Sequence, residues 1–183
     1  MKVNDYSKDI AFAEDKDLSV KINSFIRKKL SGVGISISNV VSVTDKNLQF
    51  QGVDKILTDT NFKRLKVEEK VRRNTKNDIL IELISNNNEY LKSIKGIGWG
   101  LKDYNTDLLV YYFADTNTGY VFSWKKFQSA LMKNLPQWYD IAKTRKRGFG
   151  LFKAQNKRYY SLNIAIPWKN FLKAYEEAGG TII

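Results

Sequence analysis

The sequence predicts one α/β domain, and three features of the chain support this prediction. Its 183 residues are a usual length for a single domain. Apolar residues recur at helical spacing near the start of the chain, and a strand-like pattern replaces this spacing after residue 34. We find no internal repeat and no linker rich in Pro or Gly. We therefore expect a single domain over residues 1–183.

The first half of the chain is predicted to form one helix followed by strands. Residues 15–31 are expected to form the helix, which ends at Gly32. Its buried face would consist of Leu18, Ile22, Phe25, Ile26 and Leu30. Residues rich in Val and Ile or alternating in polarity predict strands at 35–44, 49–58, 62–72 and 78–84, with a polar turn at 45–47.

The second half is predicted to begin with a hairpin and to end with a helix. Strands are expected at 108–114 and 120–124, and Ser123 is a suitable N-cap for a helix that Pro136 breaks or restarts. A dense basic and aromatic stretch follows at 143–160. A strand at 161–166 and a helix that opens at Pro167 and ends at Gly179-Gly180 complete the chain.

The charge of the chain favours a polyanionic partner. Lys and Arg outnumber Asp and Glu by 31 to 19, which gives a net charge of +12. Such a surplus is the electrostatic footprint of a nucleic-acid-binding protein. Solubility, or an AT-rich genome that enriches Lys, Asn and Ile, is the alternative origin of the charge.

The chain has no Cys and no His, and this absence excludes several kinds of chemistry. Thiol nucleophiles, disulfides, Cys-based zinc sites, Ser-His-Asp triads and nucleases with a histidine base all require these residues. Carboxylates and Lys remain, and they indicate a hard metal such as Mg²⁺ or Mn²⁺. The N-terminus lacks an apolar signal region, and no apolar run approaches the length of a membrane span, so we expect a cytoplasmic protein.

Three residues are the candidate catalytic set: Asp54, Glu68 and Lys70. Glu68 and Lys70 lie two residues apart in a predicted strand, so their side chains point to the same face, and Asp54 on the preceding strand could approach them. Glu69, a rival ligand, falls on the opposite face. Two carboxylates could hold Mg²⁺, which activates a water, while Lys70 orients this water or helps to deprotonate it. Without a metal, the crowded carboxylates should raise the pKa of one of them.

This arrangement resembles the PD-(D/E)xK nuclease superfamily, in which an Asp on one strand precedes Glu-x-Lys on the next, after an N-terminal helix. The resemblance covers about residues 15–115 and includes the strand with Glu82, Gly98-Trp99 and the aromatic strand at 108–113. Val53 replaces the Pro of the superfamily's name, a replacement that is common among its members. The resemblance implies a restriction-endonuclease-like fold, a mixed β-sheet flanked by helices, with a basic and aromatic C-terminal extension at about 123–183.

The resemblance also implies further candidate residues and partners. Glu82 is a candidate third metal ligand, although a Glu at a strand edge is common, and Glu14 could contribute a carboxylate or favour the helix N-terminus. By analogy with the superfamily, a two-fold homodimer would suit cleavage of both DNA strands. The sequence alone distinguishes neither DNA from RNA nor duplexes from single strands or junctions.

A basic surface with interleaved aromatic residues is predicted in the C-terminal extension. Exposed charges would contact phosphates, and exposed rings such as those of residues 149, 152, 159 and 160 would stack on bases; a solvated loop with core aromatics is the alternative. The candidate nucleic-acid-binding residues are Arg72, Arg73, Lys76, Arg145, Lys146, Arg147, Lys153, Lys157 and Arg158.

The sequence therefore predicts a Mg²⁺-dependent or Mn²⁺-dependent nuclease that hydrolyses DNA. Two alternatives remain open at this stage. One is a nucleic-acid-binding module that keeps the fold but cleaves nothing. The other is an interaction protein, such as a phage-encoded inhibitor, whose charge mimics or blocks nucleic-acid contacts.

Overall fold

The structure is a computed structural model that describes residue 12 and residues 15–156 and 158–183. The chain forms two compact units, each assembled from separate stretches of sequence. Of the described residues, the five-stranded unit comprises residues 12, 15–75, 104–127 and 180–183, and the three-stranded unit comprises residues 76–103, 128–156 and 158–179. Helices accompany both sheets, so the α/β class is confirmed. Whether the units act as the single domain that the sequence predicts stays a prediction.

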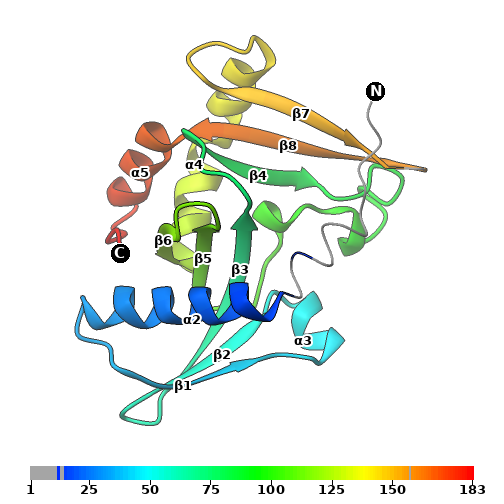
Figure 1. The fold of residues 1–183 in the computed structure, drawn as a ribbon. Helices are drawn as coiled ribbons and strands as arrows, with labels where there is room; N and C mark the ends of the chain where they lie inside the picture. Colours follow the sequence, from blue (N-terminus) through cyan, green and yellow to red (C-terminus); the bar gives the residue numbers. More distant parts are fainter. Residues whose placement is uncertain (1–11, 13–14, 157) are drawn as a thin grey trace. The chain divides into compact units, whose positions relative to one another are not determined.

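The five-stranded unit contains a mixed sheet with the strand order β1-β2-β3-β5-β6 (Figure 1). β1 (Ile37–Ser42), β2 (Lys55–Asp59) and β3 (Arg64–Arg72) form an antiparallel meander. β3 then pairs in parallel with β5 (Leu108–Phe113), and β5 pairs antiparallel with β6 (Thr118–Ser123). The mixed sheet and the hairpin follow the prediction.

Helix α2 (Lys16–Ser31) lies across one face of this sheet (Figure 1). Asp15 caps it, because its Oδ1 accepts hydrogen bonds from the N–H groups of Asp17 and Leu18 at 2.9 and 3.2 Å. All five residues of the predicted apolar face are buried, and each buried side chain of this size stabilises the fold by roughly 1.5–3 kcal/mol. They pack with sheet residues Leu57, Val67, Val110, Tyr112 and Val121.

The prediction was wrong between β1 and β2, where a short helix replaces the expected turn and the start of the strand. Helix α3 (Lys46–Phe50) begins after Asp45, whose Oδ1 accepts hydrogen bonds from the N–H groups of Asn47 and Leu48. An Asp at an N-cap favours helix over turn. β2 therefore begins at Lys55, and Asp54 precedes it directly.

The three-stranded unit contains an antiparallel sheet with the order β4-β8-β7. β4 (Asp78–Ile84) and β8 (Tyr160–Pro167) match predicted strands, whereas β7 (Gly150–Gln155) lies within the basic stretch and was not predicted. Helix α5 (Trp168–Glu177) follows Pro167 as expected, and it packs on β8 and β4 through Phe171, Ala174 and Tyr175.

Two further elements differ from the prediction. Helix α4 (Trp124–Lys143) runs through Pro136 without a break, because the buried face continues on both sides of it in Leu131 and Trp138. The run Gly96-Ile97-Gly98-Trp99-Gly100 predicts a flexible loop, but its three glycines are tightly packed beside the 3₁₀ turns η1 (Ile94–Gly96) and η2 (Trp99–Leu101). A Cβ on Gly98 would lie 2.2 Å from the carbonyl oxygen of Glu82.

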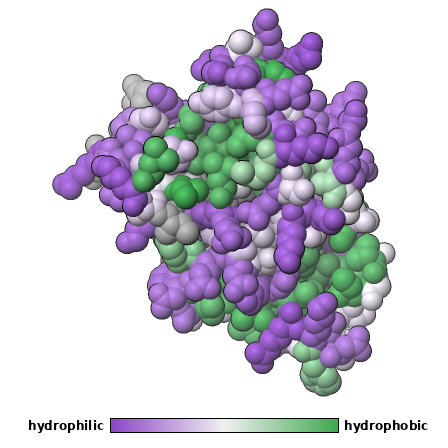
Figure 2. All heavy atoms as spheres, turned by 180° about the vertical axis from the view of Figure 1, so that it is seen from behind, coloured by the Kyte–Doolittle hydropathy of each residue, from purple (hydrophilic) through white to green (hydrophobic). Residues whose placement is uncertain are grey.

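On one face of the molecule, hydrophilic side chains surround separate hydrophobic patches (Figure 2). In the part of the chain that the structure describes, no helix has the length and apolar character needed to cross a membrane.

Candidate active site

Asp54 is held by backbone hydrogen bonds on both sides, although it lies outside a strand. Its N–H donates to the carbonyl of Val67 on β3, and its carbonyl accepts from the N–H of Val43, each across 2.8 Å. Its side chain is also fixed, because Oδ2 accepts a hydrogen bond from the N–H of Glu69 at 2.7 Å. The start of β2 and the middle of β3 therefore position this carboxylate.

Glu68 and Lys70 share one face of β3, as their spacing predicts, and they form an ion pair through Oε1 and Nζ. The Glu68 side chain is 3% exposed and the Lys70 side chain 28% exposed. The pKa of Glu68 is raised from 4.5 to about 7, and burial is the largest cause. The ammonium of Lys70 opposes this rise. The neighbouring Asp54 carboxyl adds to it, both by its charge and by a hydrogen bond to Glu68. Asp54, Glu68 and Lys70 thus lie together in the structure.

Lys70 remains a cation in this environment. Burial alone would lower its pKa, but the carboxylates of Glu68 and Asp54 and the phenol of Tyr104 outweigh that effect, so its pKa is raised. The ammonium therefore stays charged at neutral pH. A permanent charge favours a role for Lys70 in electrostatic stabilisation over one in proton abstraction. The sequence alone did not decide between these roles.

The opposite face of β3 carries a second, buried charge pair. Glu69 Oε2 lies 3.2 Å from Nζ of Lys55 on β2, and this ammonium also contacts Ser19 Oγ at 3.2 Å and Asn23 Oδ1 at 2.8 Å on α2. Burial raises the pKa of the Glu69 carboxyl, while Lys55 opposes the rise. Glu69 points away from the side chains of Glu68 and Lys70, as the alternation predicts.

Tyr104 belongs to the same site, although it was not among the residues predicted from the sequence. Its ring packs on Gly52, where a Cβ would lie 2.3 Å from the ring, and it stacks at a tilt on Trp124 with 5.4 Å between ring centroids. Gly52 also has φ +77°, a conformation that favours Gly. The Gly52-Val53-Asp54 sequence was the available signal, since a Gly two residues before a candidate ligand can mark a close approach of another group.

The remaining predicted carboxylates are those of Glu82 and Glu14. Glu82 is half-buried on β4 in the three-stranded unit, on a different sheet from β3. Glu14 lies outside the described residues. No group of three or more Asp and Glu residues suited to a metal ion occurs among the residues that the structure describes. A metal at Asp54 and Glu68 would need its other ligands from backbone, water or substrate.

The predicted basic residues lie in both units. In the five-stranded unit, Arg72 is half-buried at the end of β3 and Arg73 lies over the ring of Phe12 at 4.8 Å. The three-stranded unit carries the rest on its surface: Lys76, Arg145, Lys146, Arg147, Lys153 and Arg158 are exposed. Lys157 lies outside the described residues.

The most concentrated basic group, Arg145, Lys146 and Arg147, forms the turn between α4 and β7. Arg145 and Arg147 adopt φ values of 51° and 55°, and Gly148 follows with φ +80°. The aromatic residues nearby divide between the surface and the core. Phe152 is 51% exposed, whereas Phe149 is buried beside Trp138, which excludes Phe149 from stacking on a base.

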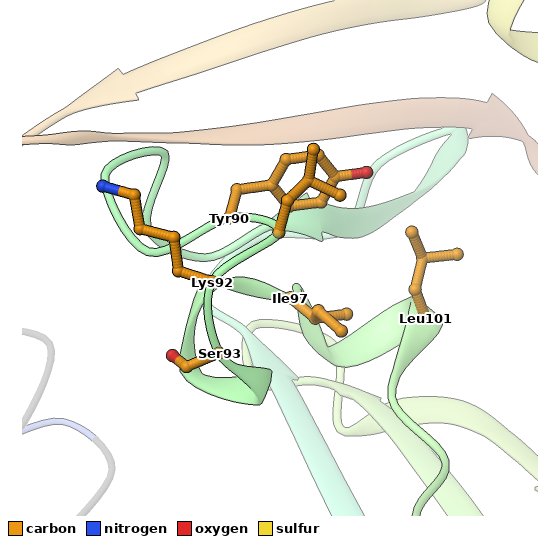
Figure 3. A pocket seen from close by; sticks show the side chains of 6 residues that line it. Tyr90, Lys92, Ser93, Ile97 and Leu101 are labelled. Atoms are coloured by element: carbon orange, nitrogen blue, oxygen red, sulfur yellow. The ribbon is translucent and has the colours of Figure 1, made fainter.

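A separate small cavity in the three-stranded unit has a volume of about 350 Å³. Tyr90, Leu91, Lys92, Ser93, Ile97 and Leu101 line it (Figure 3). These residues include no carboxylate, so this cavity lacks the chemistry of the cluster around Glu68.

Comparisons of the chain with protein-family models, with curated proteins and with solved structures find no match.

Proposed function

We propose that the protein is a Mg²⁺-dependent or Mn²⁺-dependent nuclease of the PD-(D/E)xK type that hydrolyses DNA, with Asp54, Glu68 and Lys70 as its catalytic residues. The observation that carries this proposal is the convergence of two carboxyl groups and one ammonium at the junction of β2 and β3, where the pKa of Glu68 is about 7. A strongly shifted pKa with a specific charged partner is a mark of functional sites.

The donor groups fit a hard divalent cation. Mg²⁺ is commonly bound by one or two carboxylates together with water and substrate phosphates. Asp54 and Glu68 supply the two carboxylates, and a cation between them would favour the ionised form of Glu68 that burial disfavours. In a strand, the N–H and the C=O of one residue point to the same edge. The N–H of Glu69 points toward Asp54, so the carbonyl oxygen of Glu69 faces the same edge and is a further candidate metal ligand.

Each residue has a distinct role in this proposal. A bound metal would lower the pKa of a water molecule and neutralise charge at the phosphorus. Asp54 and Glu68 would hold the metal, and the Glu69 N–H keeps the Asp54 carboxylate in place. Lys70, with its raised pKa, would contribute positive charge where negative charge develops on the phosphate oxygens.

One observation favours a second candidate, a nucleic-acid-binding module without catalysis. Lys70 and Glu68 form a direct ion pair with each other. Such a pair would also be expected if both residues had a purely structural role. The exposed basic turn at 145–147 would serve binding in either case.

Cleavage assays test the proposal. The full chain is incubated with supercoiled plasmid and with labelled single-stranded, duplex and branched DNA, in Mg²⁺, Mn²⁺ or EDTA. We expect metal-dependent cleavage that Glu68→Gln and Lys70→Met each slow by roughly 100-fold or more. Glu69→Gln is the matched control, because it makes the same chemical change one residue away on the opposite face of β3.

Circular dichroism establishes that each variant is folded. Equal loss of cleavage in Glu68→Gln and Glu69→Gln would contradict the assignment of Glu68 as the ligand. If the wild type cleaves no substrate yet binds DNA in a salt-sensitive manner that Glu68→Gln leaves unchanged, the non-catalytic module replaces the nuclease.

A further inference from the structure

The five-stranded unit carries a second surface feature, away from the Asp54 cluster, which we call the α2 groove. Its volume is about 770 Å³. One wall consists of residues of α2 and of the two residues after it, from Val20 to Val33, and the other wall includes Tyr112 and residues 117–119 of the β5–β6 hairpin.

The floor of the α2 groove is aromatic, but its rings are not available for stacking. Phe25 and Tyr112 meet edge to face with 5.2 Å between ring centroids, and they are 9% and 0% exposed. The Tyr112 hydroxyl donates to Asn117 Oδ1 at 2.9 Å. The exposed apolar groups are aliphatic instead: Val20 is 64% exposed and Val33 44% exposed.

The rim of the α2 groove is positively charged. Lys21, Lys28 and Lys29 lie along the α2 wall, and Nζ of Lys29 lies 5.7 Å from the centre of the Phe25 ring. None of the described residues that line the groove is Asp or Glu. An occupant must therefore offer apolar groups to the valines and negative charge to the lysines.

The dimensions and chemistry select one class of occupant. From Val20 to Gly32 the helical wall extends roughly 18 Å at 1.5 Å per residue. This length suits about twelve residues of a second helix, and a helix in a groove is a common mode of peptide recognition. Single-stranded nucleic acid would need exposed rings for its bases, and the rings here are covered.

We propose that the α2 groove binds an acidic amphipathic helix of a partner protein. The apolar face of that helix lies on the exposed side chains of Val20 and Val33, and its carboxylates meet Lys21, Lys28 and Lys29. This interaction does not depend on the proposed nuclease activity, because none of these residues belongs to the Asp54 cluster.

Fluorescence anisotropy with a labelled synthetic peptide tests the proposal on the full chain. The peptide has about twelve residues, the length that matches the wall, with Leu on one face and Glu on the other. A second peptide has the same composition in a scrambled order that removes the apolar face. We expect the amphipathic peptide to bind at least about 10-fold more tightly than the scrambled one, because only it buries apolar surface in the groove.

Two variants with the same change of charge locate the binding site. Lys21→Glu/Lys28→Glu reverses two charges at the groove, whereas Lys46→Glu/Lys63→Glu reverses two exposed charges elsewhere in the five-stranded unit. We expect the groove variant to weaken binding by at least about 10-fold and the control variant to change it by less than about 3-fold. Val20→Ser, at an exposed position, should also weaken binding.

Three results would overturn the proposal. The first is no binding of the amphipathic peptide, and the second is equal weakening by the two charge-reversal variants, which indicates attraction to net charge alone. The third is displacement of the peptide by a single-stranded oligonucleotide whose own affinity falls only in the groove variant. That result would make the α2 groove a nucleic-acid surface.

Discussion

The N–H of Glu69 donates a hydrogen bond to Oδ2 of Asp54 across 2.7 Å, so the backbone of one strand holds a side chain at the start of another. The side chain of Glu69 meanwhile points to the opposite face and pairs with Lys55. The pairing of Lys55 with Val67 fixes the alignment of β2 and β3. Slippage of this register by one residue would turn Glu68 and Lys70 away from Asp54. The geometry of the candidate active site is therefore a property of the strand register.

The stability of the fold should depend on pH through Glu68. Its pKa is about 7 in the folded protein and near 4.5 when unfolded, so the folded state binds more protons between these values. Stability should therefore fall as pH rises from about 4.5 to about 7, by about 3 kcal/mol at about 1.4 kcal/mol per pKa unit. Urea unfolding across this range measures the slope, and Glu68→Gln should reduce it. The pKa of Glu69 is raised in the same direction, so a smaller slope should remain. A slope unchanged in Glu68→Gln would contradict this assignment.

Divalent metal should stabilise the folded protein by binding at Asp54 and Glu68. A ligand that binds only the folded state at about ten times its Kd adds about 1.4 kcal/mol of stability. We expect Mg²⁺ to raise Tm above pH 7, where Glu68 is ionised, and EDTA to reverse the increase. Differential scanning calorimetry of the wild type and Asp54→Asn measures this effect. An equal increase of Tm in Asp54→Asn would place the metal elsewhere. Asp59→Asn is the matched control, since Asp59 lies at the far end of β2.

Substitution of Gly52 by Ala should lower the stability of the folded protein more than the same substitution of Gly34, which has a similar φ. Gly52→Ala forces an Ala into φ +77° and places its Cβ 2.3 Å from the Tyr104 ring. Gly34→Ala imposes similar strain at φ +81°, but no atom lies within 4 Å of the added Cβ. We expect a loss of roughly 1–2 kcal/mol for Gly34→Ala from backbone strain and of about 1–3 kcal/mol more for Gly52→Ala from overpacking. Chemical denaturation compares the two, and equal losses would mean that Tyr104 moves aside without cost.

Much of the fold was predictable because several elements carry strong periodic signals. Helix α2 has its full apolar face and an Asp cap, and β3 places Glu68 and Lys70 on one face by simple alternation. The pairing of strands was not predictable in the same way. From its sequence, β4 would be expected to join the same sheet as the strands before it. It pairs instead with β8, which lies about eighty residues later in the sequence.

The errors of prediction have identifiable physical causes. Asp45 is suitable both for a turn and for a helix N-cap, and only the structure shows that its carboxylate caps α3. Pro136 breaks many helices, but the buried residues on both sides keep α4 continuous. Tyr104 joins the site from a segment without regular periodicity, and its only signal in the sequence was the distant Gly52, which does not reveal which residue approaches it. The rise in the pKa of Glu68 follows the expectation of crowded carboxylates, although burial is its largest cause.

Removal of the buried ammonium of Lys55 should be far more costly than removal of an exposed one. Lys55→Met leaves the Glu69 carboxylate buried without its cation, which costs roughly 3–5 kcal/mol. The exposed pair between Lys173 and Glu177, 3.8 Å apart, is the matched control, and Lys173→Met should cost less than about 1 kcal/mol. Urea unfolding measures both losses. Adding Glu69→Gln to Lys55→Met should recover part of the stability, and similar losses in the two single variants would contradict the buried pair.

The basic turn at 145–147 should contribute to DNA affinity in a salt-dependent manner. Each phosphate contact by Lys or Arg adds about 0.9 to the slope of log K against log salt for duplex DNA. Arg145→Gln/Lys146→Gln/Arg147→Gln should therefore reduce this slope by about 2–3 if all three contact phosphates. The control variant Lys125→Gln/Lys126→Gln/Lys133→Gln removes the same charge from exposed positions on α4 and should change the slope by less than about 1. Titration of labelled duplex DNA at several salt concentrations measures both slopes. Equal reductions would mean that DNA responds to net charge rather than to the turn.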